Sequence, residues 1–159
     1  MAQMTVTSTA FEMNQPIPPR YTGDGQDMSP PLAWSGAPEA TRQYALIVDD
    51  PDAPRPQPWV HWVLYAVGPN CTHLPEGIPP AQRVSDPPGL IQGTNSWDKA
   101  GYGGPAPPPG HGVHHYHFKL YALDSALELA PGLSKEALVK AIDGHVLAEA
   151  ELIGTYSRG

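Results

Sequence analysis

Four histidines stand close together near the end of the stretch GYGGPAPPPGHGVHHYHFKLYAL, residues 101–123. Imidazole rings titrate near neutral pH, so they can act as acid, base, metal ligand or anion-binding group. His111 lies in a loop rich in glycine and proline, whereas His114, His115 and His117 begin a segment with the alternating pattern of a strand. The face on which each ring lies decides which chemistry is available.

Strand alternation separates these rings. His114 and Tyr116 fall on the face that continues as the apolar positions of residues 118–122, and we expect that face to lie inward. His115 and His117 fall on the other face beside Lys119. The ammonium group of Lys119 would oppose a divalent cation at an H-x-H pair, so we expect no metal site there.

Two carboxylates mark the end of an apolar run at residues 44–50. Asp50 and Asp52 bracket Pro51, and a carboxylate at a strand end either faces a site or bonds its own backbone in a turn. Further metal ligands are not evident nearby in the sequence. Both the functional and the turn interpretation stay open.

His61 lies in the middle of the most apolar segment, residues 59–67. A polar ring there needs a partner, so His61 is either a core histidine bonded to a carbonyl group or part of a pocket wall. Strand alternation places Trp59 on the same face as His61, with Val60 and Trp62 on the other.

The loop YGGPAPPPG adds a mechanism for anion binding. Glycines at 101, 103 and 104 permit backbone conformations that point successive amide groups into one concavity. Such a nest beside His114 and Tyr116 would suit an oxyanion. If protonated histidines attract the anion, its affinity should fall as the pH rises through about 6 to 8.

The elements that must position these residues are mostly strands. We expect strands at residues 4–11, 44–50, 59–67 and 114–123, with a turn-rich connection up to about residue 98. A helix is expected at residues 133–144, with Ser134 at its N-cap and Gly144 at its C-cap. Residues 145–158 could extend it before a last strand near 152–156. The prediction is a mainly β fold of antiparallel sheets, in one domain spanning residues 1–159, with one or two peripheral helices near the C-terminus.

Composition narrows the function classes. The 159 residues carry a formal net charge of −7, which disfavours nucleic acid and anionic membrane surfaces as partners. The single cysteine, Cys71, excludes an intrachain disulfide. We expect no secretory signal in the first residues, no membrane-spanning segment and a cytoplasmic location.

Five segments together resemble the phosphatidylethanolamine-binding protein family, which includes Raf kinase inhibitor-like proteins. They are GDGQDMSPPLAW, VDDPDAP, WVHW, GYGGPAPPPGHGVHHYHF and GHVLAEAELIGTYSR. Their order and spacing are most similar to the family's bacterial and archaeal branch, over residues 11–158. The resemblance implies a β domain with peripheral helices and a pocket for phosphate-like anions. By motif match, it implies ligand binding by Asp50, Asp52, Trp59, His61, Gly104, Pro108, His114 and Tyr116.

The function expected on these grounds is a small-anion-binding regulatory protein that is not an enzyme. It needs no cofactor or metal, and its ligand is a small anionic or phosphorylated molecule. The resemblance further implies that the protein inhibits a target protein, either a kinase or a protease. A homodimer is a further possible assembly. The alternative is a phosphoester hydrolase with His61 and His114 as acid and base.

Overall fold

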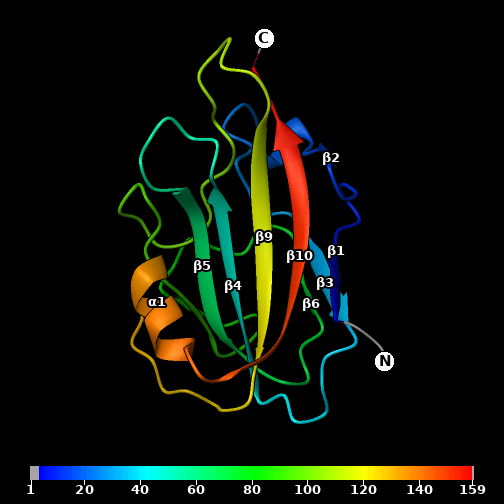
Figure 1. Cartoon of the computed structure of the whole chain (residues 1–159), viewed down its shortest axis with the longest axis vertical. Helices are drawn as coiled ribbons and strands as arrows, with labels where there is room; N and C mark the ends of the chain where they lie inside the picture. Colours follow the sequence, from blue (N-terminus) through cyan, green and yellow to red (C-terminus); the bar gives the residue numbers. More distant parts are fainter. Residues whose placement is uncertain (1–3, 159) are drawn as a thin grey trace.

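The chain forms two β-sheets and a short helix, as a computed structural model of residues 4–158 shows (Figure 1). The larger sheet has the order β2-β10-β9-β4-β5-β8-β7, and the smaller has the order β1-β3-β6. The strands are β1 (Thr5–Thr7), β2 (Gln15–Pro16), β3 (Leu32–Ser35), β4 (Gln43–Asp50), β5 (Trp59–Val67), β6 (His73–Leu74), β7 (Arg83–Val84), β8 (Leu90–Gln92), β9 (His114–Leu123) and β10 (Val146–Tyr156). The helices are η1 (Pro19–Tyr21), a single 3-10 turn, and α1 (Lys135–Ile142). The predicted mainly β fold is confirmed.

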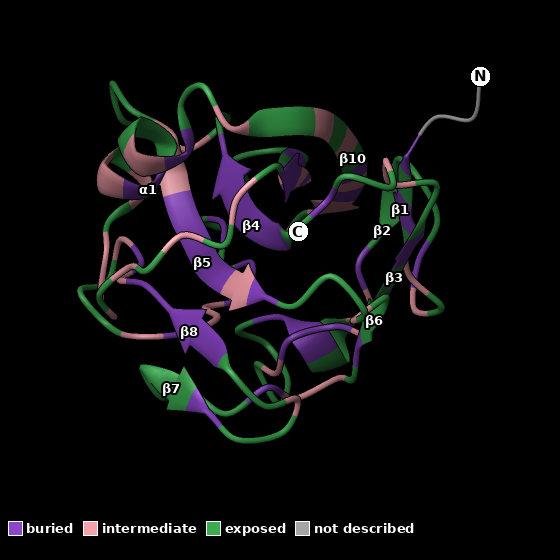
Figure 2. Ribbon diagram, turned by 90° about the horizontal axis from the view of Figure 1, so that it is seen from below, coloured by how far each residue is buried: buried purple, intermediate pink, exposed green. Residues whose placement is uncertain are grey.

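Both faces of the central strands are covered, which explains their unbroken apolar runs. On one face, Leu46 and Val48 of β4 pack into a core shared with the small sheet; on the other, Ala45 and Ile47 pack against Leu138 of α1. Figure 2 shows β4 and β5 buried almost throughout, between these two layers. The central strands are therefore held rigidly from both sides.

Strand pairing is antiparallel throughout the described sheets, except where β2 runs parallel to β10. The expected strands at 59–67 and 114–123 match β5 and β9, and β4 begins one residue earlier than expected. The first strand is shorter than expected, because only Thr5–Thr7 pair with β3. The turn-rich connection also holds three short strands, β6, β7 and β8.

The C-terminal segment corrects one expectation. Helix α1 begins as expected, with the Ser134 hydroxyl accepting a hydrogen bond from the Ala137 amide at 3.1 Å, and Gly144 follows its end with a φ of +83°. The suggested helical extension beyond it is wrong. Residues 146–156 form the single strand β10, paired with β9 along its length, because the ladder to β9 outweighs the weak helical preference of its alanines and glutamates.

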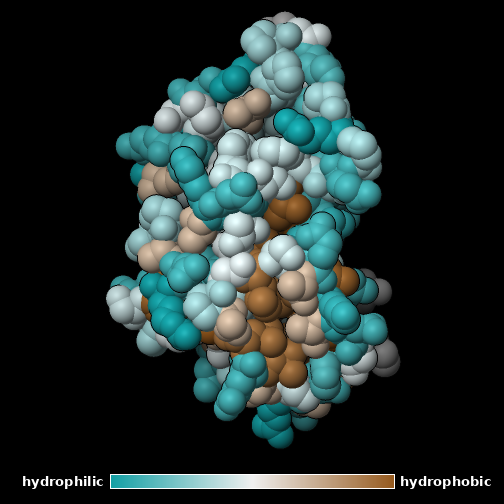
Figure 3. All heavy atoms as spheres, turned by 90° about the vertical axis from the view of Figure 1, so that its left-hand side faces the viewer, coloured by the Kyte–Doolittle hydropathy of each residue, from teal (hydrophilic) through white to brown (hydrophobic). Residues whose placement is uncertain are grey.

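The surface is divided between polar and apolar regions. Figure 3 shows the face that carries α1, where apolar side chains gather in the lower half and the upper half is mostly hydrophilic. None of the helices described here is long and apolar enough to cross a membrane.

Candidate functional site

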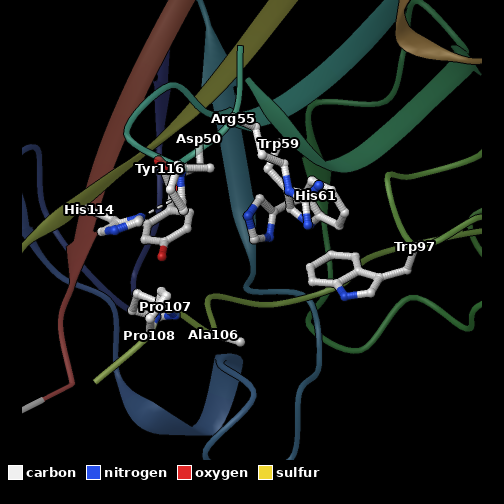
Figure 4. Close-up of a pocket in the computed structure, with 12 residues that line it drawn as sticks. Asp50, Arg55, Trp59, His61, Trp97, Ala106, Pro107, Pro108, His114 and Tyr116 are labelled. Atoms are coloured by element: carbon white, nitrogen blue, oxygen red, sulfur yellow. Dashed lines mark hydrogen bonds and ion pairs between the residues drawn. The ribbon is translucent and has the colours of Figure 1, made fainter. Parts of the chain in front are cut away.

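A cavity of about 210 Å³ opens at the end of the large sheet where β4 ends and both β5 and β9 begin. Adjacent antiparallel strands bring these termini together, although they are far apart in sequence. Twelve residues line the cavity: Asp50, Ala53, Pro54, Arg55, Trp59, His61, Trp97, Ala106, Pro107, Pro108, His114 and Tyr116 (Figure 4). Six of the eight predicted ligand residues are among them.

His114 is fixed by hydrogen bonds on both ring nitrogens. Its Nδ1 lies 2.7 Å from Oδ2 of Asp50, and its Nε2 lies 2.5 Å from Nδ1 of His111. His114 and Asp50 are almost completely buried. The carboxylate can only accept, so Nδ1 of His114 carries the proton of that bond. This arrangement of an imidazole oriented by a buried carboxylate fixes the ring and its tautomer.

Asp50 also performs the turn role that its sequence setting suggested. Its Oδ1 accepts a hydrogen bond from the backbone amide of Asp52 at 2.8 Å. The turn interpretation and the pocket interpretation of Asp50 therefore hold together, one for each carboxylate oxygen.

The Tyr116 hydroxyl makes no hydrogen bond to another group among residues 4–158 and is open to the cavity. It points away from Asp50, toward the Pro107–Pro108 wall (Figure 4). Burial and the nearby charge of Asp50 raise the pKa of Tyr116 well above its ordinary value, so the group stays protonated. The ring is 1% exposed and meets the His61 ring edge-on, with centroids 5.0 Å apart.

His61 occupies an irregular position in β5. The pairing passes from Val48–Trp62 to Asp49–Val60, which leaves His61 without a residue opposite it. Strict alternation was therefore wrong here: Val60 packs on the α1 side, whereas Trp62 packs in the core shared with the small sheet. The bulge turns the His61 ring into the pocket.

Gly103 holds His61 through two hydrogen bonds. The His61 ring donates from Nδ1 to the Gly103 carbonyl at 2.6 Å, and the Gly103 amide donates to the His61 carbonyl at 2.9 Å. Burial lowers the pKa of His61 to about 4, although the Gly103 bond and the charge of Asp50 act to raise it. His61 is thus neutral at pH 6 to 8, and the expected charge attraction cannot come from this ring.

Arg55 brings a guanidinium to the pocket lining, and no sequence pattern had indicated it. Its guanidinium lies 4.4 Å from the centroid of the Trp59 ring, and Trp59 meets Trp97 edge-on at 5.5 Å. Trp97 was missed as well. Neither residue belongs to a motif with fixed spacing, so only the fold brings them to this wall.

Asp52 and Gly104 lie outside the cavity lining, so their predicted part in ligand binding stays a prediction. Oδ2 of Asp52 accepts hydrogen bonds from the backbone and ring of His115, both at 2.8 Å. The Gly104 amide donates to Oδ1 of Asp27 at 2.7 Å. Since the Gly103 amide is also engaged, the expected nest of free glycine amides is wrong for these two groups.

The outward rings behave as alternation predicted. Along β9, His114 and Tyr116 are buried, His115 is exposed and His117 is partly exposed. His117 lies 3.1 Å from Glu151 of β10. Within residues 4–158 no group of three or more histidine, cysteine, aspartate or glutamate side chains is placed to hold a metal ion.

Sequence and structure comparisons agree on the class of protein that this fold and pocket define. The family model described as phosphatidylethanolamine-binding protein matches residues 7–157. A "UPF0098 protein" of Methanothermobacter thermautotrophicus is 50% identical over 156 residues, covering 98% of this chain and 100% of its own.

Two solved structures share the fold over the whole chain. A phosphatidylethanolamine-binding protein homologue from Chlamydia trachomatis is 40% identical with a TM-score of 0.89, covering 100% of both chains. YbcL of E. coli, described as a member of the mammalian PEBP family, is 32% identical with a TM-score of 0.91, covering 99% of this chain and 100% of its own. The chain belongs to the phosphatidylethanolamine-binding protein family.

Proposed function

We propose that the chain binds a small anion in this pocket, with the phosphate group as the preferred class. The observation that supports this most directly is the Tyr116 hydroxyl, a neutral donor in the pocket wall with no partner among the described residues. The Tyr116 oxygen is not among the sealed, unsatisfied atoms of the described core; it is open to the cavity, where a ligand that accepts a hydrogen bond can reach it.

The charges around the cavity favour an anion as that ligand. Arg55 brings a guanidinium, which forms paired hydrogen bonds with phosphate or carboxylate oxygens. The negative charge of Asp50 is directed at His114, 2.7 Å away, and the polar atoms of Asp52 are turned toward His115. A cavity of about 210 Å³ has room for a phosphate group with a small substituent.

We further propose that binding is not followed by turnover. The Asp50–His114 pair resembles a general base with its orienting carboxylate, which is the observation in favour of the hydrolase alternative. However, His111 occupies the Nε2 through which His114 would act as base, and the Nδ1 of His61 is engaged by the Gly103 carbonyl. Regulation of a kinase or protease through protein contacts is a further proposal, drawn from the resemblance alone.

Calorimetric titration with inorganic phosphate tests the proposal. Wild type should bind phosphate, and Tyr116→Phe, which removes only the hydroxyl, should bind about 10- to 100-fold more weakly. Tyr121→Phe is the matched control, because Tyr121 lies on the opposite face of β9 and lines no cavity described here. Absence of phosphate binding to wild type, or equal affinity in Tyr116→Phe, would refute the site.

A turnover assay with p-nitrophenyl phosphate separates the two functions. We expect no release of nitrophenol above the buffer rate. Release that disappears in His114→Ala would establish the hydrolase instead.

A further inference from the structure

In the pocket, the ring nitrogen through which His114 could bind an anion is already occupied by another histidine, His111. Nδ1 of His114 is committed to Asp50, which leaves Nε2 as the only free position for a ligand. That Nε2 is 2.5 Å from Nδ1 of His111, and the two rings lie 4.8 Å apart at 55°.

A hydrogen bond between two imidazole nitrogens contains one proton. Two lone pairs would repel, and so would two N–H groups. Whichever ring carries that proton, Nε2 of His114 is unavailable to a third group while His111 is in place. An anion can bond to His114 only after the His111 ring has moved away.

The chain around His111 is built to allow this movement. Gly110 and Gly112 flank it with φ values of +77° and +90°, and nothing lies within 4 Å of where a Cβ would stand on either glycine. Residues 108–113 are exposed, and Figure 1 shows the loop before β9 projecting beyond the end of the sheet. At the loop tip, the Gly110 amide donates to the Arg158 carbonyl at 2.9 Å and the His111 amide donates to the Pro108 carbonyl at 3.2 Å.

We propose that His111 is a displaceable latch that occupies the anion-binding nitrogen of His114 and is exchanged for the ligand. This inference rests on the anion-binding function proposed above and adds the control of its access. With Nδ1–H held by Asp50, the freed Nε2 of a neutral His114 is a lone pair, so the anion must supply the proton of the new bond: a P–OH group of hydrogen phosphate gives its proton to Nε2, and His114 becomes an imidazolium between Asp50 and the phosphate oxygen. The exchange is favourable because a neutral N–H···N bond is replaced by this charge-assisted bond. Non-anionic molecules gain no such bond, so the latch also selects against them.

The latch lowers the apparent affinity, because only the open fraction of molecules can bind. Removing it should therefore tighten binding. A neutral hydrogen bond of ordinary strength keeps most molecules closed, so only a minor fraction can bind at any moment. His111→Ala should therefore bind inorganic phosphate about 2- to 10-fold more tightly than wild type. A mere structural defect would weaken binding instead, so the direction of the change is diagnostic.

The test is a phosphate titration of wild type, His111→Ala, His114→Ala and His117→Ala, with thermal unfolding to show that each variant folds. His117→Ala is the control: it removes the same ring from the same segment, but that ring contacts Glu151 on the outer face. We expect tighter binding in His111→Ala, strong loss in His114→Ala and no change in His117→Ala.

The outcomes separate the latch from the anion site. If His114→Ala loses binding while His111→Ala binds equally or more weakly, the anion site stands and the latch is wrong. If neither wild type nor His111→Ala binds phosphate, both proposals fail. The imidazole ¹⁵N signals of His111 give an independent readout: saturating phosphate should shift them toward the values of a solvent-exposed ring, and unchanged signals would overturn the latch.

Discussion

Replacing His61 by glutamine should remove an acid-sensitive part of the folding free energy. Burial lowers the pKa of His61 from 6.5 to about 4 in the folded chain. In the unfolded chain the ring is hydrated and keeps its ordinary value. Between these two pKa values the unfolded state binds more protons than the folded state, so stability falls as the pH falls.

The magnitude follows from the two pKa values. Above pH 7 the ring is neutral in both states and contributes no pH dependence. Each unit of pKa difference corresponds to about 1.4 kcal/mol, so His61 alone should cost the fold about 2 kcal/mol at pH 5 and about 3 kcal/mol at pH 4. Glutamine does not titrate and can donate to the same Gly103 carbonyl.

Urea unfolding of wild type and His61→Gln at several pH values between 7 and 4 measures the effect. The difference in unfolding free energy between the two proteins isolates His61, because all other titrating groups are shared. Wild type should lose about 3 kcal/mol relative to the variant on going from pH 7 to pH 4. A difference that stays constant over this range would show that His61 titrates normally and would refute the account of its burial.

Three further predictions concern the pocket and its supports. His114→Ala should weaken phosphate binding by about 1.5–3 kcal/mol, measured by calorimetry, whereas His115→Ala should have little effect because its ring is exposed on the outer face. Gly104→Ala should destabilise the fold by about 1–3 kcal/mol in urea unfolding, because the new Cβ would lie 2.5 Å from both Oδ1 of Asp27 and the Tyr21 carbonyl oxygen. Gly68→Ala is its control, because nothing lies within 4 Å of a Cβ there, and an equal loss of stability in both variants would contradict the steric explanation. Protein purified without a histidine tag should contain no stoichiometric transition metal, and one zinc or iron per chain in elemental analysis would contradict this.

Much of the fold could be predicted because local patterns and tertiary packing agree. The apolar runs of β4 and β5 and the alternation along β9 describe strands whose burial is dictated by their own side chains. Ser134 likewise marks the start of α1 through a bond within its first turn. The exception is β10, whose composition is compatible with a helix. Its structure depends on pairing with β9, a partner that no local pattern reveals.

The pocket, too, could be predicted only in part. Alternation alone placed His114 and Tyr116 inward and His115 outward, since the period of a strand is a property of the backbone. The bulge at His61 could not be predicted, because it arises from the mismatch between β5 and its neighbour β4. Trp97 and Arg55 have no motif, and their approach to the cavity depends on how two loops pack.

The residue types and their faces are therefore properties of the sequence: strand alternation placed His114 and Tyr116 on one inward face, and the family resemblance implied that Asp50 joins them. The tertiary structure alone decided which of their atoms are free. It engaged the amides of Gly103 and Gly104, neutralised His61 by burial, left the Tyr116 hydroxyl open and placed His111 against His114. The physical reason is that hydrogen-bond pairing and desolvation depend on distances between segments remote in the chain, which a one-dimensional pattern does not contain.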